Sequence, residues 1–152
     1  MREITSIAPG RTCLFGDHQD YLGLPIIACA INRHITLKAI ENNSTNFNIN
    51  LPNINQKRTI NINHKVLNLE KEDFFISTLK VLKRYNCIPN NGFNIEITGT
   101  IPINAGTSSS SALVVSWVHF LLKAFGPKEL LTPESISQLA FESKVLEFNN
   151  PG

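Results

Sequence analysis

Several features that would assign a function directly are scarce or missing in these 152 residues. The three cysteines, Cys13, Cys29 and Cys87, are odd in number and widely spaced. They predict neither a disulfide framework nor a CxxC metal pair, and they suit a reducing compartment. The chain has no run of about 18 apolar residues and no secretory signal at its start. We therefore expect a cytoplasmic protein without a membrane partner.

Charge of one sign is also lacking. The formal net charge is +2, which is too small to predict a nucleic-acid partner. The one local basic cluster, Lys80, Lys83 and Arg84, is typical of the solvated face of a helix. The Walker A pattern, the Gly-x-Gly-x-x-Gly pattern and the Gly-x-Ser-x-Gly pattern are absent, which argues against P-loop enzymes, dinucleotide folds and α/β-hydrolases.

What is present indicates a single α+β domain over residues 1–152. Hydrophobic residues make up 42% of the chain, enough for a core. Alternating segments predict strands, and apolar residues three or four apart predict helices, without a regular βαβ repeat. The expected strands are Ile4–Ala8 (followed by a turn at Pro9-Gly10), Thr12–Phe15, His34–Glu41, Phe47–Leu51, Thr59–Asn63 and Phe93–Thr98. The expected helices are Lys71–Asn86, Ser109–Phe125 and one from Thr132 to about Phe148.

A loop of small residues lies between the strand Phe93–Thr98 and the helix Ser109–Phe125. It reads Pro-Ile-Asn-Ala-Gly-Thr-Ser-Ser-Ser-Ser-Ala over residues 102–112. The first turn of a helix has unpaired N–H groups and partial positive charge, so such a loop is a candidate phosphate cradle. A serine-rich turn with a helix cap explains the same residues equally well.

A second polar cluster lies near the start of the chain. Arg11, Asp17, His18, Asp20 and Tyr21 occur within a dozen residues. Carboxylates accept hydrogen bonds from sugar hydroxyls, and arginine stabilises phosphoryl charge. A charged surface turn is the alternative. The remaining histidines are too scattered to hold a metal, and a core histidine is the favoured interpretation of His119.

Together the two clusters resemble a known family. Residues 9–21, Pro-Gly-Arg-Thr-Cys-Leu-Phe-Gly-Asp-His-Gln-Asp-Tyr, resemble the first motif of galactokinases, and residues 102–110 resemble the second motif of the galactokinase, homoserine kinase, mevalonate kinase and phosphomevalonate kinase (GHMP) superfamily. The resemblance implies an N-terminal kinase domain with a fold like the second domain of ribosomal protein S5. It also implies two partners, a monosaccharide such as galactose and ATP, together with Mg²⁺.

The resemblance also implies roles for individual residues. Arg11 would lie beside the reacting hydroxyl and the transferring phosphoryl group. The sugar would be bound by Asp17, His18, Asp20 and Tyr21. The nucleotide would be bound by Pro102, Ala105, Gly106, Thr107, Ser108, Ser109, Ser110 and Ser111. The expected ligands of Mg²⁺ are Ser110 and a glutamate on the following helix, Glu142 or Glu147.

The chain departs from the family pattern in several places. Asp17 stands where a glutamate is usual, Gln19 replaces a threonine, Thr107 a leucine and Ser111 an alanine. The first two changes leave the sugar open. Relatives continue beyond the position of Gly152 into a segment with the proposed catalytic aspartate, and they have a C-terminal domain with a third motif. We therefore expect an N-terminal part that lacks the C-terminal domain.

The function expected from these motifs is that of a galactokinase-like sugar-1-kinase. In the full protein the γ-phosphate of ATP would pass to a monosaccharide hydroxyl, and this chain alone would have little activity. Three alternatives stay open: a non-catalytic regulator that binds sugar and ATP, a kinase for another small alcohol, and an S5-like RNA-binding domain, which the weak charge disfavours. We also expect self-association through apolar surface that a C-terminal domain would cover.

Overall fold

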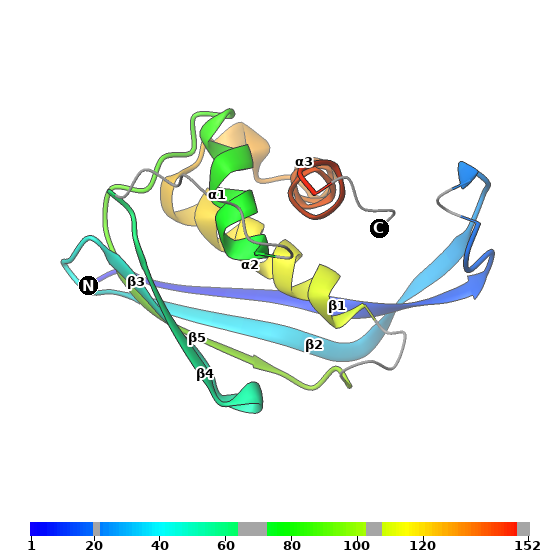
Figure 1. Cartoon of the computed structure of the whole chain (residues 1–152), viewed down its shortest axis with the longest axis horizontal. Coiled ribbons are helices and arrows are strands. Elements are labelled where there is room, and N and C mark those ends of the chain that lie inside the picture. Colours follow the sequence, from blue (N-terminus) through cyan, green and yellow to red (C-terminus); the bar gives the residue numbers. More distant parts are fainter. Residues whose placement is uncertain (20–21, 64–72, 103–107, 149–152) are drawn as a thin grey trace.

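The chain folds into one mixed sheet with its helices on one face, as Figure 1 shows for a computed structural model that describes residues 1–19, 22–63, 73–102 and 108–148. The strands are β1 (Glu3–Phe15), β2 (Ile27–Glu41), β3 (Asn46–Leu51), β4 (Gln56–Asn61) and β5 (Phe93–Gly99). The helices are α1 (Phe74–Lys83), α2 (Ser109–Phe125) and α3 (Pro133–Phe141), with short 3-10 turns η2 (Pro52–Ile54) and η3 (Lys128–Leu130) and a π-helical segment η4 (Glu142–Leu146).

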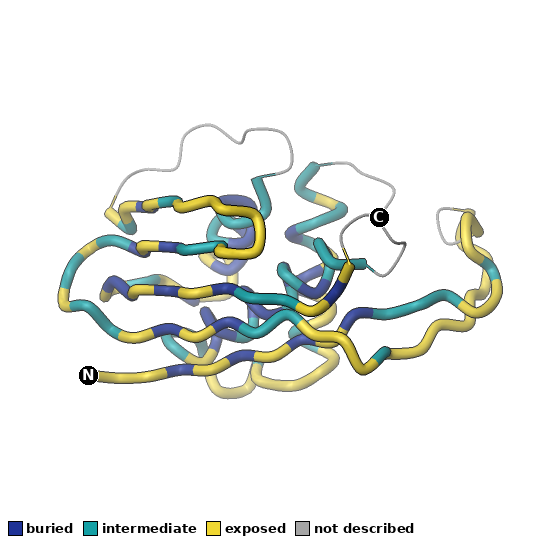
Figure 2. The backbone as a smooth tube through the Cα atoms, turned by 90° about the horizontal axis from the view of Figure 1, so that it is seen from below, coloured by how far each residue is buried: buried dark blue, intermediate teal, exposed yellow. Residues whose placement is uncertain are grey.

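The sheet order is β1-β2-β5-β3-β4, in which only the β3–β5 pairing is parallel. Alternation places one side of each strand under the helices, so Leu37 and Ala39 of β2 are fully buried. Figure 2 shows the resulting alternation of buried and exposed residues along the strands. The predicted α+β class is confirmed.

Helix α2 supplies most of the core above the sheet. It is apolar on most sides, and Trp117, Phe120 and Val118 are essentially inaccessible to solvent. The Trp117 ring stands edge-on to Phe47 of β3, with ring centroids 5.6 Å apart. Phe120 stacks edge-to-face on Phe93 of β5 at 5.3 Å. These aromatic contacts fix α2 across the sheet, and therefore fix where its first turn lies.

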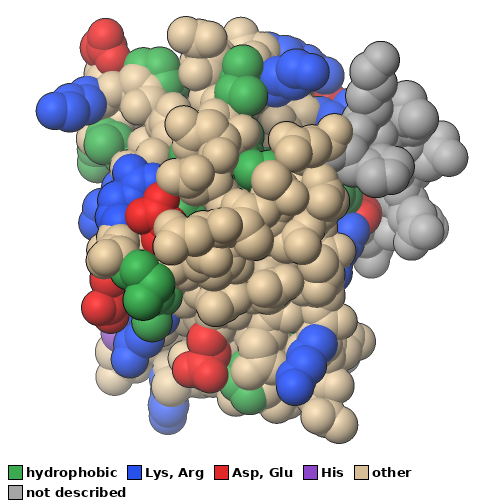
Figure 3. Space-filling view, turned by 90° about the vertical axis from the view of Figure 1, so that its left-hand side faces the viewer, with side chains coloured by type: hydrophobic (Ala, Val, Ile, Leu, Met, Phe, Trp, Pro, Cys, Tyr) green, Lys and Arg blue, Asp and Glu red, His purple; other side chains and the backbone are tan. Residues whose placement is uncertain are grey.

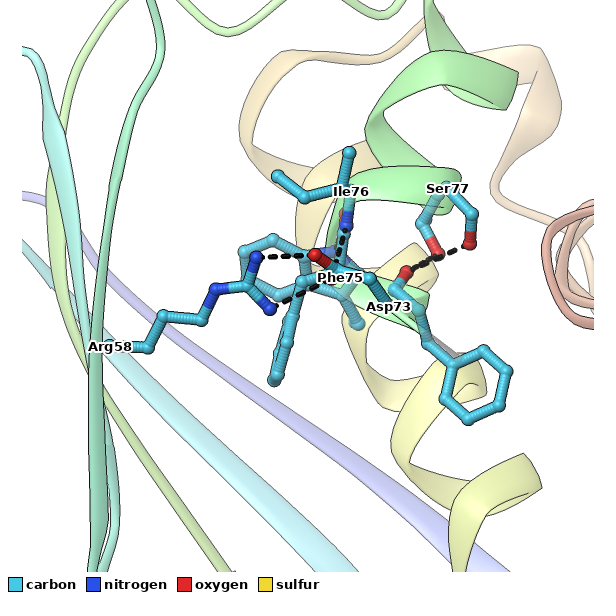
Figure 4. A network of polar contacts seen from close by, with 8 residues as sticks. Arg58, Asp73, Phe75, Ile76 and Ser77 are labelled. Carbon is cyan, nitrogen blue, oxygen red and sulfur yellow. Dashed lines mark hydrogen bonds and ion pairs between the residues drawn. The ribbon is translucent and has the colours of Figure 1, made fainter. Parts of the chain in front are cut away.

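Helix α1 is attached to the sheet by a polar network (Figure 4). The Asp73 carboxylate accepts the Ile76 N–H as the N-cap of α1. It also receives two hydrogen bonds from the Arg58 guanidinium of β4, at 2.7 and 2.6 Å. The Arg58 guanidinium lies over the Phe75 ring. A bidentate pair of this kind fixes orientation as well as distance.

Strand β1 differs from the prediction. A turn was expected at Pro9-Gly10, but β1 continues through both residues to Phe15. Pro9 pairs with His34 and Arg11 pairs with Ala30, so Gly10 alone faces the three residues Ile31, Asn32 and Arg33. This bulge in β2 lets β1 continue through Pro9 and Gly10, two residues that otherwise tend to end a strand.

The end of α3 also differs. The expected continuous helix to about Phe148 becomes the π-helical segment η4 after Phe141. The predicted cap at Thr132 is confirmed, because its hydroxyl accepts the Ser135 N–H. A π-helical segment changes the direction of the side chains that follow it.

The surface carries charges of both signs. On the face shown in Figure 3, basic and acidic side chains are interspersed among neutral polar surface. This agrees with the weak net charge and gives no support to a nucleic-acid interface on that face. Within the described ranges, no helix is both long and apolar enough to span a bilayer.

Candidate functional site

The serine-rich loop ends in an unusual helix start. Ser108, the N-cap residue of α2, has left-handed backbone angles (φ 55°, ψ 46°), and its side chain makes no capping hydrogen bond. Left-handed geometry is costly for a residue with a Cβ and is found disproportionately at functional sites. The first N–H groups of α2 are therefore not capped by the Ser108 side chain. Residues 103–107, which include the predicted nucleotide contacts Ala105, Gly106 and Thr107, lie outside the described residues.

A lysine meets this helix start. Lys144 of η4 donates a hydrogen bond of 2.8 Å from its ammonium group to the Ser111 hydroxyl. Burial and the nearby charge of Arg11 lower the pKa of Lys144. The structure thus brings together Arg11 from β1, Ser111 from α2 and Lys144 from η4. Lys144 was not predicted as a site residue, because nothing in its local sequence distinguishes it from a solvated helix lysine.

A buried serine pair determines where Lys144 points. Ser77 of α1 and Ser143 of η4 are both fully buried. The Ser77 hydroxyl donates to the Ser143 carbonyl at 2.8 Å, and the Ser143 hydroxyl donates to the Leu139 carbonyl at 2.7 Å. These bonds hold the backbone of η4 against α1. The side chain of Lys144, one residue further, is thereby directed to the start of α2.

Arg11 lies on β1 next to the β-bulge between β1 and β2, close enough for its charge to act on Lys144. It pairs with Ala30 directly after the unpaired Gly10, and it is only partly exposed. Ala112, near the start of α2, packs in one buried cluster with Ala8 of β1, which places the start of the helix near this part of the strand. Two cationic side chains and one hydroxyl therefore converge from segments that are far apart in the sequence.

Two of the predicted sugar-binding residues lie just beyond the end of β1. Asp17 and His18 follow the end of the strand, where their side chains are 74% and 85% exposed and lie 3.8 Å apart. Gly16, which precedes them, has a φ of +87°. Asp20 and Tyr21 lie outside the described residues. The side chains of Asp17 and His18 are thus exposed to solvent and do not pack into the core.

The predicted metal ligands are not assembled. The Glu142 carboxylate accepts the Tyr85 hydroxyl at 2.8 Å, and the Glu147 carboxylate accepts Lys80 at 3.0 Å and Arg84 at 2.9 Å. Burial opposes ionisation of Glu147, but the bonds from Lys80 and Arg84 prevail and lower its pKa.

The carboxylates of Glu142 and Glu147 therefore face α1, whereas the ammonium group of Lys144 lies at the start of α2. Among the described residues, no three His, Cys, Asp or Glu side chains form a group that could hold a metal ion. The set Ser110, Glu142 and Glu147 does not fit Mg²⁺, which prefers oxygen ligands free of competing cations.

The arrangement has the chemistry of an anion site. The N–H groups that the Ser108 side chain leaves uncapped, the Ser111 hydroxyl and two cations can together receive phosphate oxygens. The exposed Asp17 and His18 can accept and donate hydrogen bonds to hydroxyl groups. The site residues that the structure describes fit a phosphorylated ligand at α2 and a polyol beyond the end of β1.

Family models match two parts of the chain. The model described as the GHMP kinases N terminal domain matches residues 73–151, and the galactokinase galactose-binding signature matches residues 2–39. Arg11 lies in the second match, whereas Ser111 and Lys144 lie in the first.

Curated relatives and solved structures agree with these matches. A galactokinase from Lacticaseibacillus casei is 34% identical over 116 residues, and a mevalonate kinase from Methanocaldococcus jannaschii is 27% identical over 139 residues. The fold matches the crystal structure of the Methanococcus jannaschii mevalonate kinase, with a TM-score of 0.82 at 23% identity. It also matches the crystal structure of the Lactococcus lactis galactokinase complexed with galactose, with a TM-score of 0.79 at 21% identity.

The matched relatives are longer than this chain. The alignments cover 73% and 88% of the chain, but only 30% of the galactokinase and 44% of the mevalonate kinase. The two structural matches cover 98% and 97% of the chain and 48% and 38% of the solved chains. The chain thus spans less than half the length of these relatives.

Proposed function

The chain belongs to the family of GHMP kinase N-terminal domains, and from that premise we propose that it binds ATP and a monosaccharide in a galactokinase-like kinase. The transferred group would be the γ-phosphate, and the acceptor would be a hydroxyl of galactose or a similar sugar. The activity proposed is that of a protein that contains this chain, because the chain spans less than half the length of its relatives.

The observation that carries the proposal is the convergence of Arg11 and Ser111 near Lys144. It joins the segment that matches the galactose-binding signature to the segment that matches the kinase domain. Phosphoryl transfer depends mainly on positioning and on neutralising phosphate charge, which this set of side chains can do. Arg11 would be the catalytic residue, placed between the acceptor hydroxyl and the phosphate.

The remaining site assignments follow the same division. Asp17, His18, Asp20 and Tyr21 would bind the sugar. Pro102 and residues 105–111 would wrap the nucleotide phosphates. We expect little turnover from this chain alone, because the reaction needs a closed site from which water is excluded. Sugar-dependent ADP release measures this, and substantial release would contradict it.

Ligand-induced stabilisation tests the proposal directly. Galactose and ATP at about 100-fold above their dissociation constants should each stabilise the fold by about 2.7 kcal/mol, which raises the melting temperature by about 5 °C or more. Asp17→Asn should abolish the shift with galactose but keep the shift with ATP. Glu129→Gln, an exposed carboxylate on η3, is the matched control and should keep both shifts.

A kinase for another small alcohol is the second candidate. The similarity to mevalonate kinases in sequence and in fold favours it. Mevalonate in the same melting experiment separates the candidates. A shift with mevalonate and none with any of a panel of monosaccharides would overturn the sugar assignment. A shift with sugar and ATP, but no transfer by the longest protein that contains the chain, would favour a regulator.

A further inference from the structure

At a phosphate site that uses a protein-held metal ion, carboxylates face the phosphate. At the start of α2 the ammonium group of Lys144 is found instead. The two glutamates of this region point towards α1, where Tyr85 donates to Glu142 and two basic residues hold Glu147. Lys144 lies two positions after Glu142 in the π-helical segment η4. Unlike the two glutamates, its side chain reaches the start of α2, where it donates a hydrogen bond to Ser111.

Lys144 is held in position at the start of α2, and its ammonium group can donate further hydrogen bonds. Its ammonium group has three N–H donors, of which one is used in a hydrogen bond within the described part of the chain, to Ser111. The side chain is half-buried, and the Ser77–Ser143 hydrogen bond fixes the backbone that carries it. A lysine positioned in this way is prepared to donate to a phosphate oxygen without a large change in conformation.

A protein-held divalent cation is disfavoured at the same place. It would meet Lys144, the guanidinium of Arg11 and the partial positive charge of the helix start, all of the same sign. A phosphate group would meet three favourable partners instead. These residues therefore favour a site in which Lys144 and Arg11, and not a metal ion, neutralise the phosphate charge.

We infer that Lys144, together with Arg11, contacts a nucleotide phosphate at the start of α2 and takes the place of a magnesium ion held by Ser110, Glu142 or Glu147. This inference rests on the proposed function, because it names how the same site receives its phosphorylated substrate. Magnesium that arrives bound to ATP is then held by the nucleotide and not by these three residues.

Anion binding with and without metal tests the inference. We would titrate the chain with inorganic tripolyphosphate and with ATP by calorimetry, once in EDTA and once in excess Mg²⁺. Both anions should bind in EDTA, with an affinity equal to or above that in Mg²⁺. Lys144→Met, which keeps an unbranched side chain, should weaken binding in EDTA by about tenfold, the loss of one charge-assisted hydrogen bond. Lys144→Arg should keep most of the affinity.

The control and the reverse variant make the test specific. Lys128→Met removes an exposed lysine on η3, beyond the far end of α2 and about 25 Å from its first turn, and should change nothing. Lys144→Glu places a carboxylate beside Ser111 and should make ATP binding depend on Mg²⁺. Mn²⁺ alone, followed by its paramagnetic effect on water relaxation, should bind Lys144→Glu more tightly than the unchanged chain.

The outcomes separate the inference from the proposed function. Binding that requires Mg²⁺ in the unchanged chain, or that Lys144→Met leaves intact, overturns the inference while the kinase proposal stands. Binding that behaves as expected, in a chain that binds no sugar, supports the inference and contradicts the sugar-kinase proposal. A chain that binds neither anion under any condition contradicts both.

Discussion

At the scale of single residues, backbone geometry decides which substitutions the site region tolerates. Gly16 has a φ of +87°, and a Cβ at this position would lie 2.9 Å from the Pro25 carbonyl oxygen. Gly23 has a φ of +70°, and a Cβ there would meet nothing within 4 Å. The two glycines share the left-handed backbone but differ in the space around them.

Gly16→Ala should therefore cost more than Gly23→Ala. Left-handed geometry alone costs about 1 kcal/mol for alanine, and the contact with Pro25 adds to it in the first variant only. We expect a loss of about 2–3 kcal/mol for Gly16→Ala and about 1 kcal/mol for Gly23→Ala, measured by urea denaturation. Equal losses would show that the close contact with Pro25 has no energetic effect.

At the scale of elements, α1 depends on Asp73 twice, as its N-cap and as the partner of Arg58. Asp73→Ala removes both and should destabilise the chain by about 2 kcal/mol. Asp73→Asn keeps a good cap but loses the ionic pair, so its cost should be roughly half as large. Thermal unfolding followed by circular dichroism measures the difference. If Asp73→Asn costs as much as Asp73→Ala, the cap contributes nothing.

The contact between α2 and β1 predicts a dependence on pH. His119 Nδ1 lies 3.0 Å from the Ser6 hydroxyl oxygen, and burial together with the charge of Lys123 lowers the pKa of His119. A lowered pKa means that the unfolded chain binds a proton more readily than the folded one. The contribution of neutral His119 to the free energy of unfolding is thus fully present above about pH 6.5. It is lost as the pH falls through the pKa of His119 in the folded chain.

A variant that cannot titrate isolates this effect. In His119→Gln the free energy of unfolding should decline less between pH 7 and pH 5 than in the unchanged chain. Denaturant titrations at several pH values give both curves, and their difference removes the contribution of the other histidines. Parallel curves would show that His119 is protonated equally in the folded and unfolded states.

Sequence patterns predicted the elements unequally. The bounds of α2 are those expected, because an apolar stretch is enclosed by a serine loop and by Gly126-Pro127. The paired strands β3 and β4 also follow their alternation. Two strands, Ile4–Ala8 and Thr12–Phe15, were expected around a turn at Pro9-Gly10. They form the single strand β1, because pairing with β2 and a bulge outweigh the local turn preference.

At the scale of the whole molecule, β1 and β2 extend as a two-stranded ribbon beyond the rest of the sheet (Figure 1), and several of the exposed apolar residues belong to it. This apolar ribbon comprises exposed residues at and beyond the ends of β1 and β2, namely Leu14, Phe15, Leu22, Leu24, Ile26 and Ile27. Patches of this kind on an otherwise polar surface are typical of interfaces. Self-association of the chain stays a prediction, and this apolar ribbon is the surface on which we test it.

Sedimentation at increasing concentration checks the expectation. The unchanged chain should show a rising mean mass, whereas the double variant Phe15→Ser and Ile27→Thr, which keeps residues suited to strands or turns, should remain monomeric. Replacing the exposed Ile88, which lies outside the ribbon, by threonine is the control and should leave association unchanged. A monomer at all concentrations would contradict this role of the apolar ribbon.

The sequence by itself determined the class of fold, the extent of α2 and the two motif clusters, because these depend on local periodicity and on residue types at fixed spacing. Only the tertiary structure decided which charges meet at the start of α2. Arg11, Ser111 and Lys144 are separated by 100 and by 33 residues, and a strand bulge and a buried pair of serines bring them together. Contacts with Tyr85 and Arg84 likewise hold Glu142 and Glu147 towards α1, a direction that the spacing of residues in the sequence does not predict.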